Sequence, residues 1–140
     1  MITGLTIILL VIGAGILHHY SLIVLRRISV RGLPDTALRP ITVFVGLAVL
    51  HMIEIAIFAA LLAFKAGEAA VAVTGSGFSG SVSDWLYLAG LLFTTLGYAA
   101  FDLEGEIRLI AATGSLVGFM LLTWSATFLF AECQKVWNKE

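Results

Sequence analysis

Long apolar runs separated by short polar segments dominate this sequence, and three of these runs are long enough to cross a bilayer. Residues 5–25 contain no Asp, Glu, Lys or Arg, residues 41–64 contain only Glu54, and residues 107–131 contain only Arg108. A bilayer core is crossed by about 20 apolar residues of α-helix, at about 1.5 Å rise per residue. The pattern therefore predicts three transmembrane helices over these ranges.

A fourth apolar stretch, residues 85–96, is too short to cross a membrane and favours a re-entrant element. Ser83 and Asp84 stand directly before it, and such side chains accept backbone N–H bonds at helix starts. We therefore expect a short helix over residues 83–94. The Gly/Ser-rich segment before it, within residues 65–82, has no periodicity and is expected to be irregular.

Composition indicates that lipid is the main solvent of this chain. Of its 140 residues, 60% are hydrophobic and only 12% are charged, with a mean hydropathy of +1.05. A soluble domain of this size has about 25% charged residues, so we expect an all-α membrane protein. A net charge of −1 gives no indication of a nucleic-acid partner. No nucleophile–base pattern, phosphate loop or strongly spaced metal motif is present, so we expect no enzyme.

Basic residues predict the orientation. The connection between the first two spans holds Arg26, Arg27, Arg31 and Arg39 against one acid, Asp35. Short Arg-rich loops stay cytoplasmic, and Lys135 and Lys139 in the final segment, 132–140, agree with this. We expect a multi-pass protein with its N-terminus outside, the 26–40 loop inside, residues 65–106 outside and a cytoplasmic tail.

Residues 93–98 read Phe-Thr-Thr-Leu-Gly-Tyr, between a half-length helix and a full span. This order resembles the pore loop and selectivity filter of tetrameric potassium channels. The resemblance covers about residues 83–130, and it implies a homotetrameric ion channel in the cell inner membrane, with K⁺ as the permeant monovalent cation. By position, the pore domain 41–131 consists of an outer helix 41–64, a turret 65–82, a pore helix 83–94, a filter 95–99 and an inner helix 107–131. The N-terminal helix and loop, 1–40, are an addition to this plan.

The resemblance also implies residue roles. Filter carbonyls would come from Thr95, Leu96, Gly97, Tyr98 and Ala99. Trp85 would form an aromatic cuff with Tyr98, Thr94 would support the filter from the pore helix, and Gly118 stands where the family often has a hinge glycine.

The filter departs from the family pattern at its outer end. The family continues with Gly-Asp, where this chain has Ala99 and Ala100, and Asp102 is the nearest candidate to replace the missing carboxylate as a filter support. A glycine with positive φ is replaced by alanine at a cost of about 1–2 kcal/mol. This departure favours an alternative function, a non-conducting membrane scaffold that binds a protein partner through its N-terminal helix.

Carboxylates are concentrated in the predicted outer region. Four copies would give a negative vestibule that concentrates cations, although a simple solvated rim has the same composition. The residues are Glu68, Asp84, Asp102, Glu104 and Glu106.

Ionisable residues at membrane depth are costly and usually have a partner or a task. Glu54 lies midway along its span with His51 three residues earlier on the same face, and His18 and His19 lie in the first span. Three interpretations are open: Glu54 braces Thr94 or Tyr98 of the pore loop, or pairs with a histidine to fix helix packing, or joins His51 and either His18 or His19 in a divalent-metal or proton site. The last interpretation carries a further alternative function, an intramembrane metal-binding protein.

The last span has small residues four apart, Gly114 and Gly118, a spacing typical of close helix packing. Its hydroxyl residues are expected to line a cavity or to hydrogen-bond to a neighbouring helix; they are Ser115, Thr123, Ser125 and Thr127.

Overall fold

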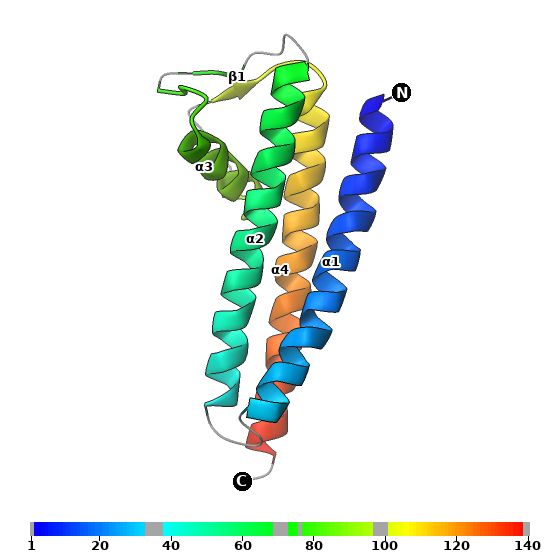
Figure 1. Ribbon diagram of the computed structural model, residues 1–140, viewed down its shortest axis with the longest axis vertical. Helices are drawn as coiled ribbons and strands as arrows, with labels where there is room; N and C mark the ends of the chain where they lie inside the picture. Colours follow the sequence, from blue (N-terminus) through cyan, green and yellow to red (C-terminus); the bar gives the residue numbers. More distant parts are fainter. Residues whose placement is uncertain (1, 33–37, 69–72, 76, 97–100, 139–140) are drawn as a thin grey trace.

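The computed structural model describes residues 2–32, 38–68, 73–75, 77–96 and 101–138. Three long helices, α1 (Ile2–Gly32), α2 (Arg39–Glu68) and α4 (Ile107–Trp137), run alternately up and down. A short helix, α3 (Val82–Phe93), and two strands, β1 (Val73–Thr74) and β2 (Asp102–Leu103), lie at one end (Figure 1). The expected all-α class is therefore confirmed, apart from one very short strand pair.

The three predicted spans are confirmed as helices that are long and apolar enough to cross a membrane, namely Thr3–Gly32, Arg39–Gly67 and Ile107–Trp137. Each is longer than its apolar run. Hydropathy marks only the part of a helix that suits lipid, whereas the helical hydrogen bonds continue into the polar flanks. In Figure 1 the N-terminus lies at the same end as β1, and the C-terminus lies at the end where α1 connects to α2.

Two predicted segment boundaries were wrong for this reason. Arg26, Arg27 and Arg31 lie within α1, and Arg39 begins α2, so most of the predicted 26–40 loop is helix. The predicted tail from residue 132 is also helical as far as Trp137. The arginines remain gathered at one end of the molecule, but they are fixed to helix ends.

The short helix α3 begins at Val82, close to the predicted start at residue 83. Its N-cap is Ser81, not the predicted Ser83-Asp84 pair, and Asp84 completes a capping box at the third helical position. The Asp84 carboxylate also accepts bonds from the Ser79 hydroxyl at 2.7 Å and the Ser79 backbone N–H at 2.8 Å. These bonds, with those from Ser81, lower the pKa of Asp84 to about 2.

The predicted start of the turret at residue 65 was wrong, and so was the expected irregularity of its Gly/Ser-rich part at Val73 and Thr74. The helix α2 extends to Glu68, and Val73 and Thr74 pair antiparallel with Leu103 and Asp102. The two strands lie about thirty residues apart in sequence, so no local pattern indicates their pairing. The strand pair ties the segment before α3 to the segment before α4.

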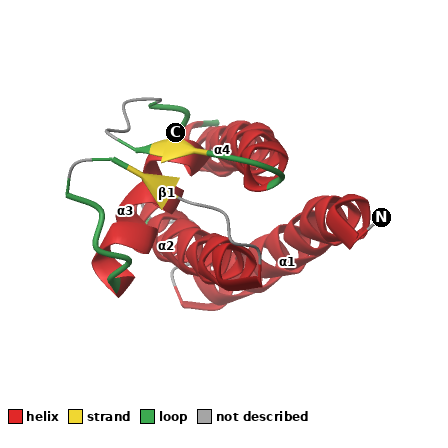
Figure 2. Ribbon diagram, turned by 90° about the horizontal axis from the view of Figure 1, so that it is seen from above, coloured by secondary structure: helices red, strands yellow, loops and turns green. Residues whose placement is uncertain are grey.

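Helices α2 and α4 form the centre of the molecule, with α3 on one side and α1 on the other (Figures 1 and 2). One apolar cluster joins α2, α3 and the start of α4 around Phe58, Leu62 and Ile110. A second joins α1 to α2 around Leu22 and Leu47 at the opposite end. Toward the N-terminus, α1 diverges from the other two long helices (Figure 1).

Candidate functional site

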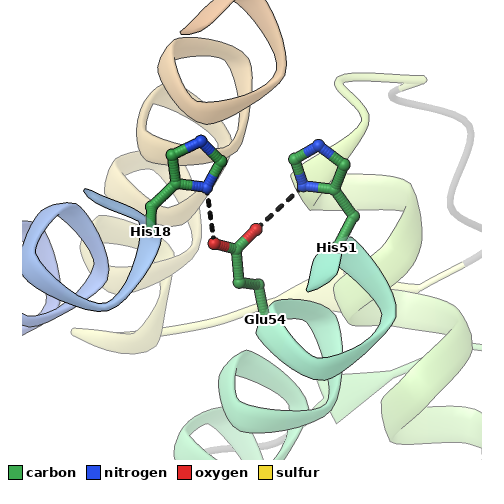
Figure 3. A group of neighbouring side chains, drawn as sticks. All are labelled: His18, His51 and Glu54. Atoms are coloured by element: carbon green, nitrogen blue, oxygen red, sulfur yellow. Dashed lines mark hydrogen bonds and ion pairs between the residues drawn. The ribbon is translucent and has the colours of Figure 1, made fainter. Parts of the chain in front are cut away.

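Three ionisable side chains meet between the two apolar clusters. The Glu54 carboxylate accepts one bond from His18 Nδ1 and one from His51 Nδ1, each at 2.8 Å (Figure 3). His51 and Glu54 are one turn apart on α2, which places both on one face. His18 comes from α1, so the cluster links two spans through a single carboxylate.

This His–Glu–His cluster is buried. His18 is 0% exposed and Glu54 is 5% exposed, while His51 is half-buried. Glu54 is fifteen residues from the start of α2 at Arg39, which is about 22 Å along the axis and thus deep in the span. At such depth an ionisable group needs a polar partner, and each member of the cluster has one.

A third helix completes the surroundings of the cluster. The Ser125 hydroxyl of α4 lies 3.4 Å from His18 Nε2, as expected for a hydroxyl that bonds to a neighbouring helix. Ser115, Thr123 and Thr127 instead donate to carbonyls of their own helix. Side chains of α2 and α4 therefore contact the His18 ring of α1 on its two nitrogens.

Of the two adjacent histidines that the sequence offered for this cluster, the structure brings in His18 and not His19. His19 is exposed, and its ring lies beside those of Tyr20 and Trp124. Adjacent residues on a helix point about 100° apart, so His18 and His19 cannot both face α2. The described residues that offer metal-ligand atoms within 4.8 Å of one another are His18, His51 and Glu54.

The predicted brace between Glu54 and Thr94 is not observed. The Thr94 hydroxyl donates to the Gly90 carbonyl of its own helix at 2.7 Å. Tyr98, the other proposed partner, lies outside the described residues. Glu54 therefore has the interhelix pairing of the second interpretation, and the same geometry keeps the metal and proton interpretation open.

The cluster is nevertheless adjacent to the end of α3. The His51 ring lies 5.8 Å from that of Phe93, the last residue of α3. Phe93 is in turn packed on α4 at Gly118, where an added Cβ would lie 2.3 Å from the Phe93 carbonyl oxygen. Gly118 thus permits a close approach of two backbones, which explains the small residue without a hinge.

The sequence-predicted filter is described only in part. Thr95 and Leu96 are exposed, and Thr95 has a positive φ of 56°, a conformation that is uncommon outside glycine. Gly97, Tyr98, Ala99 and Ala100 lie outside the described residues. The chain thus turns sharply directly after α3, at the position of the predicted filter.

The remaining predicted support residues lie at the β1 end. Trp85 is half-buried and packs edge-to-face on Phe78, with ring centroids 4.9 Å apart. Asp102 is exposed in β2. Trp85 therefore has an aromatic partner in the described turret, and its predicted contact with Tyr98 remains a prediction.

A second buried charged cluster was missed in the sequence. Glu132 of α4 is 1% exposed and accepts from Arg39 and Lys135, with Arg26 Nε at 3.7 Å. The signal was the continuation of the buried face of α4 beyond residue 131, because Glu132 lies seven residues after Ser125 and fourteen after Gly118. The cluster joins the ends of all three long helices.

An apolar cavity of about 460 Å³ lies between α1, α2 and α4 where α1 diverges. Leu10, Ala14, Phe58 and Val117 line its walls, Thr6 and Lys65 lie at one end, and Glu54 lies at the other. The cavity therefore leads from the N-terminal end of the molecule to the His–Glu–His cluster.

Comparisons with protein-family models, with curated proteins and with solved structures found no match.

Proposed function

We propose that this chain is one subunit of a homotetrameric, potassium-type cation channel that conducts passively through four copies of the loop after α3. The observation that carries the proposal is the contact of the α3 end with Gly118 of α4. It supports a short helix that enters the membrane and delivers the Thr-Thr-Leu-Gly-Tyr segment to its interior.

The depth of this contact supports a re-entrant loop. Gly118 is eleven residues into α4, about 16 Å along its axis, so the end of α3 lies near the middle of the span. Irregular backbone at that depth is tolerated only where protein buries it or water reaches it. Thr94, Thr95 and Leu96 are exposed in the single chain, which favours coverage by further copies around a watery axis.

The negative charge near α3 and β2 also favours the passage of cations over anions. The carboxylates of Asp102, Glu104 and Glu106 are exposed in the described structure, and that of Asp84 is half-buried. Four copies would multiply this charge and raise the local cation concentration at the mouth. With the arginines cytoplasmic, this mouth faces outward and the N-terminus lies outside the inner membrane.

The test is cation flux from proteoliposomes that contain the purified full chain, comparing K⁺, Na⁺ and larger cations. Ala99→Gly restores the glycine of the filter pattern, and Ala48→Gly, at an exposed position of α2, is the matched control. We expect wild-type flux that favours K⁺, at least tenfold sharper selectivity for Ala99→Gly, and no change for Ala48→Gly.

Other results distinguish the alternatives. Flux without selectivity in wild type would attribute the loss of K⁺ selectivity to Ala99, which replaces the filter glycine. If Ala99→Gly conducts and wild type does not, the natural chain has a channel fold that no longer conducts. Absence of flux in both chains, reconstituted as tetramers, contradicts the proposal and favours the scaffold.

A further inference from the structure

We propose that His18, His51 and Glu54 bind one divalent transition-metal ion, with Zn²⁺ the best chemical match, and that the ion fastens α1 to α2 inside the membrane. This inference is independent of conduction, because it depends only on the described helices.

The ligand set and its spacing fit Zn²⁺. One ligand atom from each residue lies within 4.8 Å of the others. Zinc bonds of about 2.0–2.2 Å place two ligands of a tetrahedral ion about 3.4 Å apart, so the rings need to close by little more than about 1 Å. Imidazole with carboxylate suits Zn²⁺, whereas Ca²⁺ and Mg²⁺ prefer oxygen ligands alone.

The surroundings of His18 suit a ligand histidine. A ring that binds metal through Nδ1 carries its proton on Nε2, and that proton usually goes to a hydrogen-bond acceptor. Ser125 Oγ, 3.4 Å from His18 Nε2, is such an acceptor. The same hydroxyl donates to Nε2 when Nδ1–H points at Glu54, so both states of the ring are satisfied.

One side of the site borders the apolar cavity. Three protein ligands leave a fourth tetrahedral position for water or another small ligand. The apolar cavity between the three long helices reaches Glu54 and begins near Thr6 and Lys65. A packing role needs only one histidine on the carboxylate, whereas here two rings from two helices converge on it (Figure 3).

The experiment uses the full chain in detergent, stripped of metal with a chelator. Co²⁺ binding is followed by its visible absorption, and Zn²⁺ is then titrated calorimetrically and by displacement of Co²⁺. His51→Gln removes a ligand while its amide still donates to Glu54, and His19→Gln is the matched control on the exposed neighbour. We expect one Zn²⁺ per chain, a Kd at least tenfold weaker for His51→Gln, and no change for His19→Gln.

A second readout reports the fastening of α1. Zn²⁺ should raise the melting temperature of wild type and of His19→Gln, and should not raise that of His51→Gln. If His51→Gln elutes abnormally on gel filtration, Glu54→Asp, which shortens the carboxylate's reach, replaces it. Absence of stoichiometric Zn²⁺ binding in wild type, or equal binding by both histidine variants, overturns the inference. Neither result depends on ion flux, so a failed channel test leaves this one intact.

Discussion

At the scale of single residues, Glu132 is a buried carboxylate that forms an ion pair with a buried arginine. It is 1% exposed, and its Arg39 partner is 5% exposed. Breaking a buried ion pair by removing one partner costs about 3–5 kcal/mol, because the other charge stays buried. Lys135 and Arg26 bring further positive charge to the same carboxylate.

We therefore predict that Glu132→Gln lowers the free energy of unfolding by about 3 kcal/mol, measured by denaturant titration in detergent micelles. Glu104→Gln, at an exposed carboxylate, is the control and should change it by less than about 0.5 kcal/mol. The double variant Arg39→Met, Glu132→Met should lose less than Glu132→Gln, since it leaves no buried charge. Equal stability of Glu132→Gln and wild type would contradict this prediction.

At the scale of elements, the proposed pore loop depends on the packing of the end of α3 against α4. An added Cβ at Gly118 would meet three backbone atoms of Phe93, at 2.3, 2.8 and 2.9 Å. At Gly114 the obstacle is the Phe58 ring, which is a side chain and can turn. The Phe93 backbone can make room for an added Cβ at Gly118 only if the whole end of α3 moves.

We predict that Gly118→Ala destabilises the protein by about 1–3 kcal/mol and changes the proposed ion selectivity. Thermal melting in micelles and the flux assay measure the two effects. The control is Gly13→Ala on α1, where an added Cβ has no atom within 4 Å, and helix propensity makes it neutral or up to about 1 kcal/mol stabilising. An equal loss of stability in Gly118→Ala and Gly13→Ala would contradict close packing of α3 on α4.

At the scale of the whole molecule, the described helices expose many large apolar side chains. On α1 these include Ile8 and Ile12, and on α4 they include Leu116, Phe119 and Met120. In the proposed tetramer α4 contacts other copies, while α1, on the far side from α3, faces lipid (Figure 2). The two faces should respond differently to truncation.

We predict that Phe119→Ala lowers the stability of the tetramer by about 2 kcal/mol per chain, because a cavity in a protein interface stays partly unfilled. Ile12→Ala should leave the tetramer unchanged, since lipid chains fill the space. The measurement is the fraction of tetramer against temperature on native gels. A larger effect for Ile12→Ala would place α1, not α4, at the contact between copies.

Hydrophobic patterning along the chain was sufficient to predict α1, α2, α3 and α4, although not their exact bounds. Three apolar runs predicted three spans, and a fourth run, too short to cross, predicted α3. Such predictions succeed because the length of an apolar run is a local property and the thickness of the bilayer sets the length needed to cross it. The small face at Gly114 and Gly118 was also predicted, since helical periodicity places residues four apart on one side. The resemblance of residues 93–98 to a potassium filter stays a prediction.

Which polar groups of different helices meet became clear only from the fold. His18 and His19 are equivalent in sequence, and only the rotation of α1 selects His18 as the partner of Glu54. The pairing of β1 with β2, and of Arg39 with Glu132 across 93 positions, likewise joins residues that no local pattern relates. Contacts between helices depend on how the helices are turned and seated, which hydropathy does not encode.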